Sequence, residues 1–195
     1  MLSINQLLLS LLYIVTPFCG QCQSKALVIN QLQTDSVTAL LNDINWHGKA
    51  LASQESWRFS NQKQKIKPWF DIGFVVYSPY VTSSDGITHV THILPSQFLS
   101  ISHLPTTTGT FDLSDLIINQ RLKIKVEYEL IEGGDGITNR YVLSKSTDNW
   151  IKIIRYDPKT KLVIGAFNLE LIGRSDEVAH FKNGVFKVRM TDEFK

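Results

Sequence analysis

Hydrophobic and polar residues alternate along several short segments, as expected of β-strands with one face buried and one face in water. The clearest segment is residues 122–130. Its apolar positions are Leu122, Ile124, Val126, Tyr128 and Leu130, and the residues between them are Lys123, Lys125, Glu127 and Glu129. Residues 69–77 alternate in the same way, with Phe70, Ile72, Phe74 and Val76 on one face. The pattern predicts antiparallel strands.

A strand, a turn and a second strand are predicted over residues 150–172. The first strand, Trp150–Tyr156, is rich in β-branched and aromatic residues. Asp157 and Pro158 then favour a turn, because an Asp side chain can bond to the backbone that follows and Pro presets φ. The second strand places five residues on one face: Val163, Gly165, Phe167, Leu169 and Leu171. We expect this face to be buried.

A second hairpin is predicted around Asn183-Gly184, since this dipeptide favours a two-residue type I′ turn between strands. Such a turn would place Phe181 opposite Phe186 on the inner face. It would also direct His180 away from that face, into solvent.

About nine short strands without a βαβ rhythm predict an antiparallel β-sandwich with hairpin connections, or alternatively a closed β-barrel. We expect this domain to span residues 44–195, starting with a strand at 44–50. Further strands are expected at 97–104 and 110–113, and a loop or weak edge hairpin at 78–92. Residues 23–43 would be a linker, with a short helix at 34–42 because Val37, Leu40 and Leu41 recur at helical spacing.

Residues 1–22 resemble an export signal. The apolar run Leu7–Val15 is too short for a bilayer span of ~20 residues, but fits the apolar region of a secretory signal. Cys19 and Cys22 follow it. A cysteine at this point suggests a bacterial lipoprotein, with Cys22 or Cys19 lipidated; simple cleavage of the signal is the alternative. A redox role for Cys19-x-x-Cys22 would need a thioredoxin-like context, which does not follow.

The composition of the chain limits the kinds of partner and of metal site that we expect. The formal net charge is +2 and the chain has no Lys/Arg run, so we expect no nucleic-acid partner and membrane contact only through an N-terminal lipid anchor. Both cysteines lie in the N-terminal segment. The rest of the chain therefore has no disulfide framework and no cysteine metal site.

A family resemblance runs through residues 44–188. Its motifs are Asn45-Trp46-x-Gly48, Leu99-x-Ile101-x-x-Leu104-Pro105, Gly109-Thr110-Phe111-x-Leu113, Asn149-x-Ile151-x-Ile153, Gly165-Ala166-Phe167 and Asn183-Gly184-Val185-Phe186. In this order they resemble uncharacterised bacterial secreted lipoproteins with an all-β domain of unknown function. Ala166 stands where that family usually has Thr. The resemblance implies an envelope protein and carries over no catalytic residue.

The chain has no G-x-S-x-G, H-E-x-x-H, P-loop or dinucleotide-binding motif, so we expect no enzyme activity and no cofactor. A hydrolase whose triad assembles only in space is the weakest alternative. His89, His92 and His103 could approach one another, but residues three apart on a strand face opposite ways, so we expect no metal site. Glu132–Gly136 is expected as a glycine-rich turn rather than a calcium site.

Large aromatic residues cluster between residues 46 and 80. Trp57, Trp69 and Tyr77 lie off the predicted inner face or in polar surroundings. They could form a platform for a glycan or another small ligand, although large aromatics more often fill cores. The sequence therefore predicts an exported, membrane-tethered, non-catalytic β domain of the cell envelope, either an outer-membrane lipoprotein or periplasmic, with secretion as an alternative. A glycan- or small-ligand-binding module is the second hypothesis.

Overall fold

The computed structural model describes residues 29–54, 56–57, 65–66, 69–84, 87–113, 124–134, 136–145 and 148–191, with the backbone alone for 56–57, 65–66, 80–84 and 87–91. The chain divides after Gln31, and the second unit begins at Leu32. Cys19, Cys22 and the predicted signal lie outside the described residues. Among the residues described, no helix is long and apolar enough to cross a membrane.

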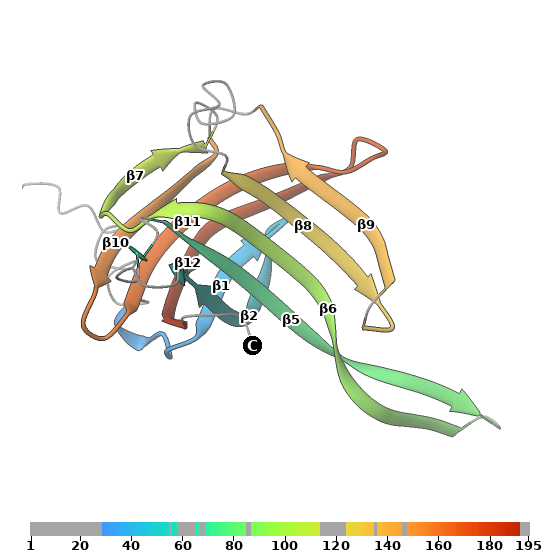
Figure 1. Ribbon diagram of the computed structural model, residues 1–195. Helices are drawn as coiled ribbons and strands as arrows, with labels where there is room; N and C mark the ends of the chain where they lie inside the picture. The colour runs from blue at the N-terminus through green and yellow to red at the C-terminus, as the bar shows by residue number, and fades with distance from the viewer. Residues whose placement is uncertain are drawn as a thin grey trace, which may run out of the picture. The chain divides into compact units, whose positions relative to one another are not determined.

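Eight strands of the second unit close into an antiparallel barrel (Figure 1). They are β1 (Ser36–Leu41), β2 (Ile44–Ser53), β5 (Trp69–Ser84), β6 (Ile87–Pro105), β8 (Lys125–Glu132), β9 (Gly136–Leu143), β11 (Leu162–Ile172) and β12 (Val178–Thr191). Each pairs with the next, and β12 returns to β1. The all-β class and the barrel alternative are confirmed. The sandwich is wrong, because β1 and the β9–β11 contact join what would otherwise be two separate sheets.

The other strands extend this framework. β10 (Trp150–Asp157) pairs with the first part of β11, and β7 (Gly109–Asp112) pairs with β10. β3 (Ser56–Trp57) and β4 (Lys65–Ile66) form a separate two-stranded sheet. β9 pairs with β11 only at Leu143–Leu171 and Val142–Ile172. β11 therefore forks, with β10 on its first part and β9 at its end.

Asn149 secures this fork. Its side chain is fully buried; Nδ2 donates to the Ser144 carbonyl at 3.0 Å and Oδ1 accepts from the Glu170 amide at 2.6 Å. The Ser144 amide in turn donates to the Glu170 carbonyl at 2.9 Å. Buried polar groups are costly unless hydrogen-bonded, so Asn149 supplies partners where the strand ladder is interrupted.

The predicted helix at residues 34–42 is wrong, since β1 occupies residues 36–41 and buries Val37 and Ala39. The barrel thus begins before residue 44, inside the expected linker. Asn42 and Asp43 have φ values of 50° and 66°, and Leu41 pairs with Ile44. Positive φ at both residues of a two-residue loop is the geometry of a type I′ hairpin.

The hairpin predicted at Asn183-Gly184 is also wrong. β12 runs through this dipeptide as one strand, and between the pairs Gly184–Phe167 and Phe181–Leu169 it carries one residue more than β11. This is a β-bulge, with Asn183 at φ 54°. Phe181 and Phe186 are five residues apart, yet the extra residue keeps both on the inner face and fully buried. His180 points away from that face, as predicted, with its side chain 42% exposed.

Other sequence predictions are confirmed. Val126 and Tyr128 of β8 and all five predicted inner positions of β11 are buried. Asp157 caps its turn by accepting from the Lys159 amide at 2.9 Å. A hydrogen bond from the Thr160 side chain, followed by the backbone amides of Lys159 and Thr160, lowers the pKa of Asp157 below its ordinary value. Gly133 and Gly134, at φ 65° and 91°, form the turn between β8 and β9.

The segment 78–92 is a hairpin, one of the two predicted options. β5 pairs with β6 as far as Ser84–Ile87, whereas β2 pairs with β5 only up to Val75 and β8 with β6 only down to Gln97. Beyond those residues β5 and β6 continue as a two-stranded ribbon that extends from the barrel (Figure 1).

Aromatic rings fill the interior of the barrel. Phe74 stacks on Phe167 with centroids 5.3 Å apart, and Phe186 lies 5.5 Å from Phe74. Trp46 meets Phe181 edge-on at 5.1 Å. All four phenylalanines are fully buried. Because large rings from facing strands meet in the centre, the interior is a packed core.

Candidate functional site

Three polar side chains inside the barrel are bonded to one another. Trp46 Nε1 and the Tyr128 hydroxyl both donate to Gln97 Oε1, at 2.7 and 2.9 Å. Burial, and secondarily the neighbouring Tyr141, raises the pKa of Tyr128 above its ordinary value. The phenol therefore stays neutral and acts as a donor. The group stabilises the interior and offers no acid or base near neutral pH.

A serine, a glutamate and a histidine lie in line at the β9–β11 fork, but not as a catalytic triad. Ser144 Oγ donates to Glu170 Oε1 at 2.7 Å, and His180 Nδ1 lies 3.5 Å from Glu170 Oε2. A triad needs the serine bonded to the imidazole, so that the imidazole can take its proton. Ser144 is also only 4% exposed. This geometry supports a structural role at the fork rather than the hydrolase hypothesis.

The histidines do not assemble a metal site among the described residues. His103 lies in a bulge opposite Asp71, with φ 63°, and its amide donates to Asp71 Oδ1 at 2.7 Å. His89 and His92 were expected on opposite faces of a strand, and the backbone pairing shows that this expectation is wrong. A register shift pairs His92 with Tyr80 and His89 with Thr82, which places both positions on one face of the ribbon.

The structure does not bring the described residues of the predicted aromatic platform together. The side chain of Trp57 lies outside the described atoms. Trp69 is partly buried, 5.9 Å from the ring of His103, whereas Tyr77 is 46% exposed. Trp69 and Tyr77 are eight residues apart on β5, which at the rise of a strand is roughly 26 Å. They therefore cannot share one small ligand.

Tyr77 instead belongs to an apolar face of the β5–β6 ribbon. It pairs with Pro95, and Pro79 pairs with Ile93. Cross-strand partners and residues two apart share a face of a ribbon, so these four residues lie together. Ile93 is 69% exposed. The ring of Tyr77 is thus exposed, as the sequence predicted, but its neighbours are Pro79, Ile93 and Pro95.

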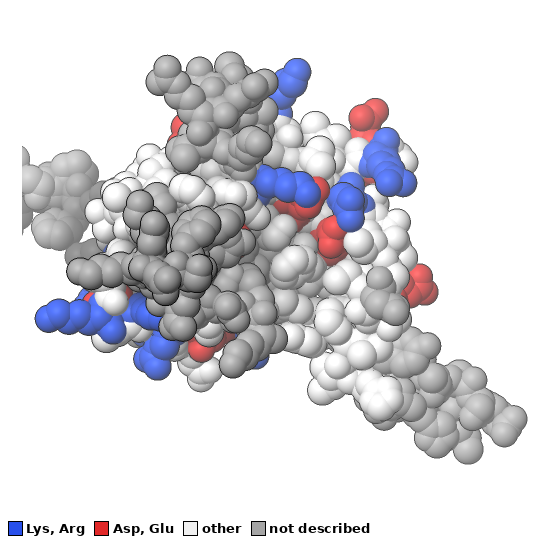
Figure 2. Space-filling view, viewed as in Figure 1, with Lys and Arg blue, Asp and Glu red and all other residues white. Residues whose placement is uncertain are grey.

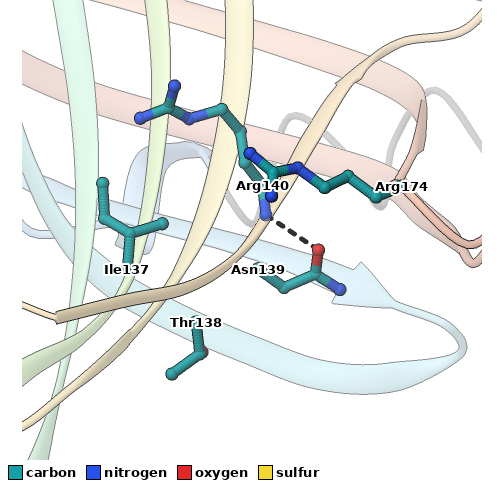
Figure 3. Close-up of a pocket in the computed structure, with 5 residues that line it drawn as sticks. All are labelled: Ile137, Thr138, Asn139, Arg140 and Arg174. Carbon is teal, nitrogen blue, oxygen red and sulfur yellow. Dashed lines mark hydrogen bonds between the residues drawn. The ribbon is translucent and has the colours of Figure 1, made fainter.

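A small hollow lies between β9 and the turn that joins β11 to β12. It measures about 160 Å³ and is lined by Ile137, Thr138, Asn139, Arg140 and Arg174 (Figure 3). Arg140 is bound to Glu129, whose Oε1 accepts from both Nε and Nη2 at 2.8 Å. Asn139 accepts the Arg140 amide at 2.9 Å and donates to the Tyr141 hydroxyl at 3.1 Å.

The sequence did not single out Arg140 or Arg174. Arg140 stands on a strand and Arg174 in a turn, without a recognisable spacing between them. Gly173 lies directly against the ring of Tyr141, so the turn that carries Arg174 comes close to β9. The short β9–β11 pairing brings this turn close to β9, and no local pattern in the sequence predicts that pairing.

Charged side chains of both signs are interspersed on the face seen in Figure 2. Lys125 pairs with Glu127 at 2.7 Å within β8, and Arg140 of β9 pairs with Glu129 of β8 at 2.8 Å. A nucleic-acid interface would need a basic stripe. The visible face does not have that pattern.

Comparison of the chain with known protein families, curated proteins and solved structures found no match. The resemblance to secreted lipoproteins thus stays a prediction from sequence motifs. Several of its residues have structural roles here: Trp46 bonds inside the barrel, Asn149 secures the fork, and Gly165, Phe167, Gly184 and Phe186 lie together between β11 and β12.

Proposed function

We propose that the chain is an exported, membrane-tethered, non-catalytic β-barrel domain of the bacterial cell envelope, acting through its outer surface without a cofactor. The observation that supports action through the outer surface is the filled interior. The rings of Phe74, Phe167, Phe181 and Phe186 occupy the place where ligand-binding barrels keep a cavity. A partner would therefore meet the outer faces, the ribbon or the hollow on β9.

Export and tethering rest on the N-terminal sequence. Residues 7–15 fit the apolar region of a secretory signal, and Cys19 and Cys22 follow at the point where a lipid could be attached. A single acyl chain holds a protein only weakly at a membrane, whereas several chains on one cysteine anchor it stably. The proposal therefore places the barrel at a membrane surface.

Fractionation of the native host tests this placement. We expect the full chain in the membrane fraction, and the double variant Cys19→Ala/Cys22→Ala in a soluble exported fraction, because the lipid attachment point is gone. The single variants identify which cysteine is modified, and Ser10→Ala in the apolar run is the matched control. A wild-type chain found in the cytosol would overturn both export and tethering.

The exposure of Tyr77 favours a second candidate function, a glycan- or small-ligand-binding module. Its ring stands beside Pro79 and Ile93 on the ribbon face and could stack on the apolar side of a sugar. Titration of the purified chain with soluble oligosaccharides, followed by intrinsic fluorescence, tests this. Tyr77→Ala should abolish binding and Tyr77→Phe should retain it, since stacking needs the ring and not the hydroxyl. If the wild-type chain binds none of the sugars, this candidate fails.

A further inference from the structure

The hollow beside β9 has features that neither its packing nor the proposed function explains. We name it the arginine hollow, defined by Ile137, Thr138, Asn139, Arg140 and Arg174. We propose that it binds one small oxyanion group, a carboxylate or a phosphate, through the guanidinium of Arg174, with Arg140 beside it.

On one side of the hollow lies a strand edge without a partner strand, and on the other lies a turn held by hydrogen bonds. Within the described chain, β9 has no strand partner between Gly136 and Tyr141 on the edge that faces away from β8. The turn that carries Arg174 is held by two bonds to Glu177, whose carbonyl accepts the Gly173 amide at 2.8 Å and whose Oε2 accepts the Ser175 amide at 3.1 Å. Arg174 thus projects from a braced turn toward an unoccupied strand edge (Figure 3).

The side chains of Thr138, Asn139 and Arg140 already have hydrogen-bond partners. Thr138 Oγ1 donates to the Leu130 carbonyl at 3.2 Å, and both ends of the Asn139 amide are engaged. Glu129 neutralises Arg140 and fixes its orientation. None of the described carboxylates forms an ion pair with Arg174. As far as the described side chains go, the guanidinium of Arg174 therefore keeps an unpaired positive charge with five N–H donors.

The size and walls of the hollow define the ligand. A volume of about 160 Å³ is below the roughly 300–1,000 Å³ of sites that hold a whole small molecule, so the hollow fits one functional group. The planar guanidinium fork matches a carboxylate or phosphate with two parallel hydrogen bonds. Ile137, 48% exposed, adds an apolar wall for the carbon skeleton that carries the anionic group.

Titration of the ¹⁵N-labelled chain with sodium phosphate, and separately with sodium acetate, tests the proposal, with chloride added to keep the ionic strength constant. We expect the Nε–Hε signal of Arg174 and the amides of Ile137 and Asn139 to shift saturably with at least one of the two anions. Arg155 is the internal control, because its side chain is 63% exposed and lies 3.9 Å from its partner Asp157. Its signal should show only a small, non-saturating shift.

Matched variants make the test specific. Arg174→Ala should weaken binding roughly tenfold or more, the usual effect of losing charge-assisted hydrogen bonds, while Arg155→Ala removes the same charge and should change nothing. Arg174→Lys keeps the charge but not the fork, so its affinity should fall between the two. Saturation by acetate alone identifies a carboxylate ligand, and saturation by phosphate alone a phosphate. If Arg174 and Arg155 respond alike to both anions, the site does not exist, and the proposed envelope function is unaffected.

Discussion

Gly184→Val should destabilise the barrel by roughly 3 kcal/mol or more, at or above the upper end of the usual cost of overpacking a core. A β-carbon on Gly184 would lie 2.5 Å from the ring of Phe167. That ring is fully buried and stacked on Phe74 at 5.3 Å, so it cannot move aside without disturbing its neighbours. The sequence also predicts harm from this change, but through a positive φ at Gly184. In the structure the positive φ belongs to Asn183.

Asn183→Gly is the matched control. Asn183 is exposed, and its φ of 54° is one that glycine adopts freely, so the free energy of unfolding should change by less than about 1 kcal/mol. Urea midpoints of the two variants measure both effects. A Gly184→Val variant as stable as Asn183→Gly would show that Phe167 does not cover the bulge.

Phe167→Ala should cost roughly 3–5 kcal/mol of stability, the range for removing a buried phenylalanine ring. Phe167 has no exposed surface and contacts Phe74, Phe181 and Phe186, with centroids 5.3, 6.4 and 6.4 Å away. A rigid ring of aromatic neighbours cannot collapse fully into the space it leaves. A shift in the urea midpoint equivalent to less than about 1 kcal/mol would contradict this packing.

The double variant Phe167→Ala/Gly184→Val tests whether the two stability losses arise from the same contact. The two positions pair across β11 and β12, and a valine at position 184 would enter the space that the ring vacates. The combined loss should therefore fall short of the sum of the single losses by more than about 1 kcal/mol. Strict additivity would mean that the two residues do not contact each other.

Two glycine–phenylalanine pairs explain why these substitutions matter together. Gly165 pairs with Phe186, and Phe167 pairs with Gly184, in reciprocal order on β11 and β12. A β-carbon on Gly165 would overlap the ring of Phe186. Each glycine thus leaves space for the ring of the opposite strand, which is how aromatic side chains stabilise glycine in sheets.

The positions of several strands and their inner faces could be predicted from the sequence, because the alternation of apolar and polar residues involves only neighbours along the chain. Val163 to Leu171 and Val126 to Tyr128 follow it closely. The turn predicted at Asn183-Gly184 was wrong because the bulge in β12 also places Asn183 at positive φ, as a type I′ turn would. Only the pairing with β11 distinguishes the two structures. The two-residue hairpin turn occurs instead at Asn42-Asp43, where the apolar spacing of residues 37–41 also suits a helix.

Closure of the barrel could not be predicted from any one segment. It depends on two residue pairs between β9 and β11 and on the position of β1 between β2 and β12. The arginine hollow follows from the same closure, since Arg140 lies on β9 and Arg174 in the turn that follows β11. The predicted aromatic platform was wrong for a related reason. Trp69 and Tyr77 are near in sequence, but they lie on one extended strand, β5, which holds them far apart.

The most direct test of the proposed function is the intact mass of the chain purified from native membranes. An exported and tethered barrel predicts a chain that starts at Cys22 or Cys19 and carries the added mass of a lipid on that cysteine. The apolar run at residues 7–15 should be absent from it. A mass equal to the unmodified chain from Met1 to Lys195 would contradict both export and tethering.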